Sequence, residues 1–164
     1  MLSLNVRVTS TGLVENGKRK LRATMRRAGA EVAAVARSEL RRAKAGGRTY
    51  YVKGGAFHVA SAPGEPPATL SGTLARSLKV YPFKSGEGVA IRARAFYALF
   101  LERGAKGGGG RKKAGRNRRG RPTTARVLLP RPFLTKALDS RADSISRRIR
   151  AAIVEDIAFK RLRP

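Results

Sequence analysis

The chain has 164 residues, of which 41% are apolar, so we expect a single domain with a modest core. Its 37 lysines and arginines outnumber its 10 acidic residues, which gives a formal net charge of +27. Such a chain repels itself and favours polyanions or acidic protein surfaces as partners. Nucleic acid is therefore the first partner to consider, an acidic protein ring the second, and an anionic membrane a distant third.

Several classes of chemistry lack the residues that they need. The chain has no cysteine, which excludes disulfides and thiolate metal sites. One histidine and ten scattered acids offer no nucleophilic triad and no metal-ligand set, so we expect no enzyme, no cofactor and no small-molecule substrate. His58 is better placed in a strand with a hydrogen-bonded ring. The N-terminus does not resemble a signal peptide, and no apolar run approaches the length of a membrane span.

The first third of the chain predicts a strand, a long helix and a hairpin. Leu2 to Val8 alternate apolar and polar residues, as a half-buried strand does. From about residue 18 to residue 44 the apolar residues recur at helical spacing: Leu21, Met25, Ala28, Val32 and Val35. This helix carries ten basic residues but only two acids, so a solvated face and a face toward a polyanion are both open. Thr49–Val52 and Ala56–Val59, separated by Lys53-Gly54-Gly55, predict a hairpin or an extended arm.

The middle of the chain begins with a proline-rich segment. Because Pro63, Pro66 and Pro67 disfavour helix in the residues before them, a helix cannot begin until after Pro67. Thr69 or Ser71 is then a candidate N-cap, with an apolar face formed by Leu70, Leu74 and Leu78. A second hairpin is expected from residues 78–83 and 88–95. A short helix follows from Phe96 to Glu102 and ends at Gly104, with a set of side chains expected in the core: Phe96, Tyr97, Phe100 and Leu101.

The last third combines a basic loop with a strand and a long helix. Residues 106–121 hold six glycines, eight basic residues and no acid, so we expect a flexible loop, placed at 105–122. The glycines are not followed by the Gly-Lys-Ser/Thr of a phosphate-binding loop. Thr123–Leu129 predicts a strand. A final helix with Pro132 in its first turn is expected to run to about Lys160, with one apolar side: Leu134, Leu138, Ile145, Ile149, Ile153 and Ile157.

These elements predict an α+β fold within one domain over residues 1–164. We expect a small, mainly antiparallel sheet of about five strands, packed with a long N-terminal helix and a long C-terminal helix. Glu65 and Glu102 are interpreted as ion-pair partners for the many arginines, because neither has a basic catalytic partner.

Three segments of this chain resemble a known family. The first is Ser61–Val80, SAPGEPPATLSGTLARSLKV; the second is Phe96–Gly104, FYALFLERG; the third is Leu129–Leu134, LPRPFL, followed by Ala137-Leu138. Together and in this order, they are similar to segments of the bacteriophage tail-completion and head–tail joining family. This group includes the minor tail proteins of the lambda Z type. The Gly/Arg tract is longer and more basic than the family's linker at that point, so its role is not implied by the resemblance.

The resemblance implies a structural virion protein at the head–tail junction, assembled in the cytoplasm of a bacterial host. It would form a homo-oligomeric ring, complete the tail, and join it to the head connector around the DNA passage. Its partners would be neck, connector and tail-tube proteins, with genomic DNA as a further candidate. The subunit interface or fold motif would comprise Pro63, Gly64, Pro66, Pro67, Gly72, Leu74, Tyr97, Glu102, Gly104, Arg131, Pro132 and Phe133.

The basic loop is expected to contact DNA or an acidic partner. The residues concerned are Lys106, Arg111, Lys112, Lys113, Arg116, Arg118, Arg119 and Arg121. Each phosphate that such a residue neutralises adds salt-sensitive, sequence-independent affinity. The tract has no aromatic residues, so base stacking is not indicated. The alternative function is therefore a free, sequence-nonspecific nucleic-acid-binding protein, which would account for the charge but not for the three segments.

Overall fold

The computed structural model describes residues 2–7, 15–51, 57–85, 88–106 and 127–161. In chain order the elements are β1 (Leu2–Arg7), α1 (Glu15–Arg42), β2 (Thr49–Tyr51), β3 (Phe57–Val59), α2 (Thr73–Ser77), β4 (Leu78–Pro82), β5 (Gly88–Ala93), α3 (Ala98–Arg103), β6 (Ala105–Lys106), β7 (Val127–Leu128), α4 (Leu134–Asp139) and α5 (Ala142–Arg161). Helices mixed with antiparallel strands, and a long helix near each end, confirm the predicted α+β class.

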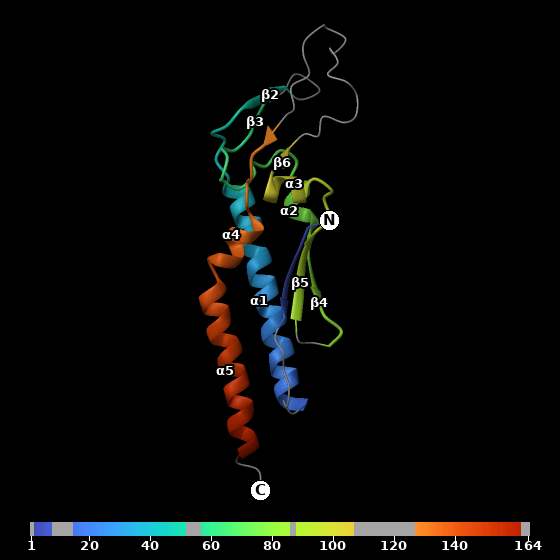
Figure 1. The fold of residues 1–164 in the computed structure, drawn as a ribbon, viewed down its shortest axis with the longest axis vertical. Helices are drawn as coiled ribbons and strands as arrows, with labels where there is room; N and C mark the ends of the chain where they lie inside the picture. Colours follow the sequence, from blue (N-terminus) through green and yellow to red (C-terminus); the bar gives the residue numbers. More distant parts are fainter. Residues whose placement is uncertain (1, 8–14, 52–56, 86–87, 107–126, 162–164) are drawn as a thin grey trace.

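Helix α1 is the centre of the fold. It lies between the β1–β5–β4 sheet on one side and helices α4 and α5 on the other (Figure 1). Because it packs on both sides, α1 contributes more than one buried stripe: Leu21, Met25, Ala28, Val32, Ala33, Ala36 and Leu40. The predicted apolar spacing is confirmed, except that Val35 is only half-buried. Gly29 allows α1 to approach the sheet closely, because a Cβ there would lie 2.7 Å from Cγ2 of Val89.

The main sheet has three strands rather than about five. Its order is β1–β5–β4, with both pairs antiparallel. Val89 and Ile91 of the central strand are buried in the core, whereas Tyr81 and Arg92 lie on the opposite face with a cation–π contact of 5.2 Å.

The other strands form separate two-stranded ribbons. In the described part of the chain, β2 pairs only with β3, and β6 only with β7. The prediction of the first hairpin is confirmed, but its membership of the main sheet is wrong. All three residues of β2 are exposed and β3 contributes none to the core cluster, so this ribbon packs outside the core.

The predicted C-terminal helix is two helices. Between α4 and α5, the Ser140 hydroxyl donates to the Ala137 carbonyl at 2.9 Å, and the Arg141 N–H donates to the Leu138 carbonyl at 2.9 Å. These shorter-range bonds replace the regular helical ladder and separate the two helices. The predicted apolar side still holds for Leu134, Ile145 and Ile149, which are buried. The side chain of Ile157 lies outside those described.

Two local predictions near the short helices are wrong. Helix α2 begins at Thr73 with Gly72 in the N-cap position, and Thr69 instead donates its hydroxyl to the Leu40 carbonyl at 2.5 Å. Leu70 is therefore outside the helix and is 61% exposed, whereas Leu74 and Leu78 are buried. Beside α3, Phe96 is 80% exposed and Phe100 47% exposed, so neither belongs to the core.

Among the described helices, none is both long and apolar enough to cross a membrane.

Candidate functional site

The three segments that carry the family resemblance lie together in space. The Gly64 N–H donates to the Pro130 carbonyl at 2.8 Å, which joins the first segment to the third. The Arg131 N–H donates to the Leu101 carbonyl at 2.7 Å, which joins the third segment to the second. We call this assembly of Ser61–Val80, Phe96–Gly104 and Leu129–Leu138 the motif cluster.

Side chains add further bonds between these segments. Arg131 is half-buried, and its Nε donates to the Ser61 carbonyl at 3.1 Å. The Lys136 Nζ donates to the Gly64 carbonyl at 2.5 Å. Each bond pairs a cationic group with a backbone oxygen from a segment about 70 residues earlier, and bonds of this kind are stronger than bonds between neutral groups.

Glu102 is the most heavily bonded carboxylate of the cluster. It is buried, and it accepts four hydrogen bonds at the start of α4. Its Oε2 accepts from the N–H groups of Phe133 and Leu134 at 3.0 and 3.2 Å, and its Oε1 from the N–H and hydroxyl of Thr135 at 2.8 and 2.6 Å. These N–H groups have no partner within the helix, so Glu102 caps α4 from a distant part of the chain.

This arrangement corrects our interpretation of Glu102. In the described structure Glu102 bonds to backbone N–H groups and a hydroxyl, not to an arginine. Glu65 is exposed and forms no ion pair with another described residue. A buried carboxylate has to be fully bonded, and the open start of a helix satisfies it as well as an arginine does.

Gly104 allows the second and third segments to approach. Its φ is +75° and its ψ is 173°, a conformation that is almost restricted to glycine. A Cβ there would lie 2.6 Å from the carbonyl oxygen of Leu128, directly before the third segment, and 3.0 Å from Cδ of Pro130 within it. Glycine is therefore favoured at position 104 by the lack of space for a side chain as well as by the backbone conformation.

The residues predicted for an interface or fold motif, apart from Glu102, divide into three groups by burial. Pro67, Leu74 and Phe133 are buried, which gives them a role in the fold of the subunit. Pro63 and Gly64 are exposed. A third set is half-buried: Pro66, Gly72, Tyr97, Gly104, Arg131 and Pro132.

Of the residues predicted to contact polyanions, Lys106 is exposed in β6, and Arg111, Lys112, Lys113, Arg116, Arg118, Arg119 and Arg121 lie outside the described residues.

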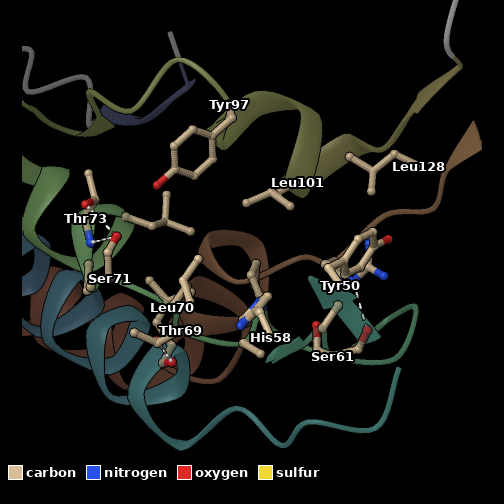
Figure 2. Close-up of a pocket in the computed structure, with 18 residues that line it drawn as sticks. Tyr50, His58, Ser61, Thr69, Leu70, Ser71, Thr73, Tyr97, Leu101 and Leu128 are labelled. Carbon is tan, nitrogen blue, oxygen red and sulfur yellow. Dashed lines mark hydrogen bonds between the residues drawn. The ribbon is translucent and has the colours of Figure 1, made fainter. Parts of the chain in front are cut away.

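A cavity of about 440 Å³ opens between the motif cluster, the β2–β3 ribbon and the end of α1. Figure 2 shows Tyr97 and Leu101 on one wall, with His58 and Leu70 on the other. Among the described residues, the lining is mainly apolar and contains no carboxylate. Ser61 is fully buried in the wall, and its hydroxyl has no hydrogen-bond partner among the described residues.

The sequence did not indicate this cavity. Its walls come from residues as far apart as Leu40 and Arg131, and only folding brings them together. One signal was available in β2 and β3, where aromatic residues occupy consecutive and paired positions: Tyr50, Tyr51 and Phe57. In so short a ribbon they cannot all be buried, and they are 47%, 81% and 64% exposed.

A second candidate surface is the basic face of α1. Its exposed cations are Arg19, Lys20, Arg22, Arg26, Arg27, Arg41 and Arg42. Glu31 pairs with Arg141 at 3.7 Å and with Arg148, and Lys20 pairs with Glu155 at 3.1 Å, so these pairs join α1 to α5 and the turn before it. The basic residues of α1 outnumber its acids, so among the described residues this helix presents an excess of positive charge to solvent.

Within the described residues, no group of three or more histidine, aspartate and glutamate side chains is arranged to hold a metal ion. Comparison with known proteins found no matching family model, no matching curated protein and no matching solved structure.

Proposed function

We propose that this chain is a structural subunit of the head–tail junction of a tailed phage or a phage-like particle. Copies of it would form a ring that completes the tail and joins it to the head connector around the DNA passage. Its work would be done by interfaces, without a catalytic residue or a cofactor.

The observation that carries this proposal is the motif cluster. The three segments that carry the resemblance are separated in the sequence by residues 81–95 and 105–128, yet they bond directly to one another, and the bond from Arg131 to Ser61 spans 70 positions. The residues that hold them are themselves part of the resemblance, namely Glu102, Gly104 and Arg131. A chance likeness of three loops would give no reason for this convergence.

The charge of the subunit supports the same role. The exposed cations of α1 offer a surface for the DNA that passes through the ring or for an acidic neighbouring protein. The mutual repulsion of subunits with a net charge of +27 would be reduced once such a partner is present. Ring formation is therefore expected to depend on the partner.

The test is electron microscopy of the purified protein, alone and mixed with tail tubes of the particle that encodes it. We expect rings on the tube ends, and density for this chain at the neck of whole particles. Absence of the chain from purified particles, together with absence of rings in the mixture, would overturn the proposal.

The second candidate is a free nucleic-acid-binding protein, which the exposed basic face of α1 favours. It predicts tight binding to free duplex DNA, with a steep loss of affinity as salt rises. Replacing Arg26 and Arg27 together by glutamate would then reduce both the affinity and the salt slope. No binding at about 0.15 M salt would exclude this candidate.

A further inference from the structure

The cavity beside the motif cluster has features that a ring subunit alone does not require. Two large apolar side chains at its wall remain in water, since Tyr50 is 47% exposed and Leu70 is 61% exposed. A hollow of about 440 Å³ is large enough for one or two bulky side chains of a partner. Buried aromatic and aliphatic anchors in such hollows contribute much of the affinity of protein interfaces.

The charge around the cavity defines the partner more closely. Arg131 is part of its wall, and the Arg48 guanidinium lies 5.7 Å from the ring centroid of Tyr50. Arg76 donates to the carbonyl of Ser71, another residue of the wall, at 2.8 Å. No carboxylate of the described residues lines the cavity, and the oxygens of nearby Glu102 are occupied by the start of α4. The apolar cavity is therefore bordered by positively charged side chains.

The wall also contains a polar group without a partner among the described residues. The Ser61 hydroxyl is fully buried without a hydrogen-bond partner in the described part of the chain. Buried hydroxyls are nearly always bonded.

We propose that this cavity binds an extended segment of a partner protein, in which an aromatic or branched apolar side chain is flanked by carboxylates. The apolar side chain enters the hollow, and the carboxylates pair with Arg48, Arg76 and Arg131. The proposal does not depend on the ring function, because it concerns one subunit and one peptide.

The experiment is a selection from a library of random heptapeptides on the purified full chain at about 0.15 M salt, followed by affinity measurement for the selected peptides. We expect an enriched pattern of one aromatic or branched apolar residue beside aspartate or glutamate. The chain has no tryptophan, so a selected peptide that carries one reports its own burial by a blue shift of its fluorescence.

Matched variants separate this site from general attraction to a basic protein. Tyr50→Ala, Leu70→Lys and Arg76→Glu should each weaken peptide binding at least tenfold. Tyr81→Ala and Arg26→Glu should change it less than twofold. Tyr81 is a suitable control because it also lies under an arginine, Arg92, but on the outer face of the main sheet. Three separate cavity variants keep the test valid if one of them fails to fold, which circular dichroism would show.

Three results would overturn the proposal. One is selection of acidic peptides without an apolar residue, with equal losses for Arg26→Glu and Arg76→Glu, which indicates general polyanion binding. Another is selection of no peptide. The third is self-association of the wild-type chain in ultracentrifugation that Tyr50→Ala abolishes, which assigns the cavity to a second copy.

Discussion

The helical body and the motif cluster are held together in different ways. In the body, α1 packs between the main sheet and α5 through regularly spaced apolar side chains, and the ion pairs of Glu31 lie at the surface. The motif cluster also contributes buried residues such as Phe133 to the core, and its three segments are further joined by bonds from Glu102 and Arg131 to backbone groups. An apolar residue of the body should therefore stabilise the fold through its buried area, whereas Glu102 and Arg131 of the cluster should do so through the hydrogen bonds that they form.

The largest effect is expected from a truncation in the body. Leu21 is 1% exposed, so Leu21→Ala leaves a cavity and should lower the free energy of unfolding by about 2–5 kcal/mol. Leu70→Ala is the matched control, because the same atoms are removed at an exposed position and the change should stay within about 0.5 kcal/mol. Urea unfolding followed by circular dichroism measures both. Equal losses of stability in the two variants would show that Leu21 does not stabilise the fold through its burial in the body.

The next effect tests the cluster through its carboxylate. Glu102→Ala removes the acceptor of four hydrogen bonds and should cost about 2–3 kcal/mol, since buried N–H groups lose their partner. Glu102→Gln keeps one acceptor oxygen and should lie between the alanine variant and the wild type. Glu65→Ala, an exposed acid of the same cluster, should change stability by less than about 0.5 kcal/mol. If Glu65→Ala were as costly as Glu102→Ala, capping of α4 would not explain the result.

Gly104 tests the close approach of two segments in the cluster. Gly104→Ala combines an unfavourable φ with a Cβ placed 2.6 Å from a backbone oxygen, and it should cost about 2 kcal/mol. Gly46→Ala is the control, because a Cβ there meets nothing within 4 Å. The Tm of Gly104→Ala in thermal unfolding should be clearly lower than that of Gly46→Ala. A neutral Gly104→Ala would mean that the segments can separate without cost.

The smallest effect is expected for the surface ion pairs of the body. Glu31→Gln loses the pairs with Arg141 and Arg148, which are exposed enough to be screened, and should cost less than about 1 kcal/mol. The difference from the wild type should shrink as salt is raised from about 0.05 to 0.5 M. A loss of stability that is large and independent of salt would show that these ion pairs contribute more to the fold than exposed pairs do.

Sequence reasoning located the segments of the candidate site but not their contacts. Prolines and glycines mark Ser61–Val80 and Phe96–Gly104 as special, yet they do not show that Glu102 caps a helix that begins 32 residues later. The sequence did not reveal the cavity either, because apolar residues that line a cavity cannot be distinguished from core residues in a sequence. Phe96 shows the converse error, because an aromatic residue next to a helix can remain in water.

Local patterns of this chain were enough to determine the α+β class, the span of α1 to within a few residues and the two hairpins. Periodicity reports which side of an element is apolar, and that preference is local. Only the tertiary structure decided that the main sheet has three strands, that the last helix divides at Ser140, and that three distant segments join around Glu102 and Arg131. These outcomes depend on which backbone groups find partners far away in the chain, and no residue's own neighbourhood contains that information.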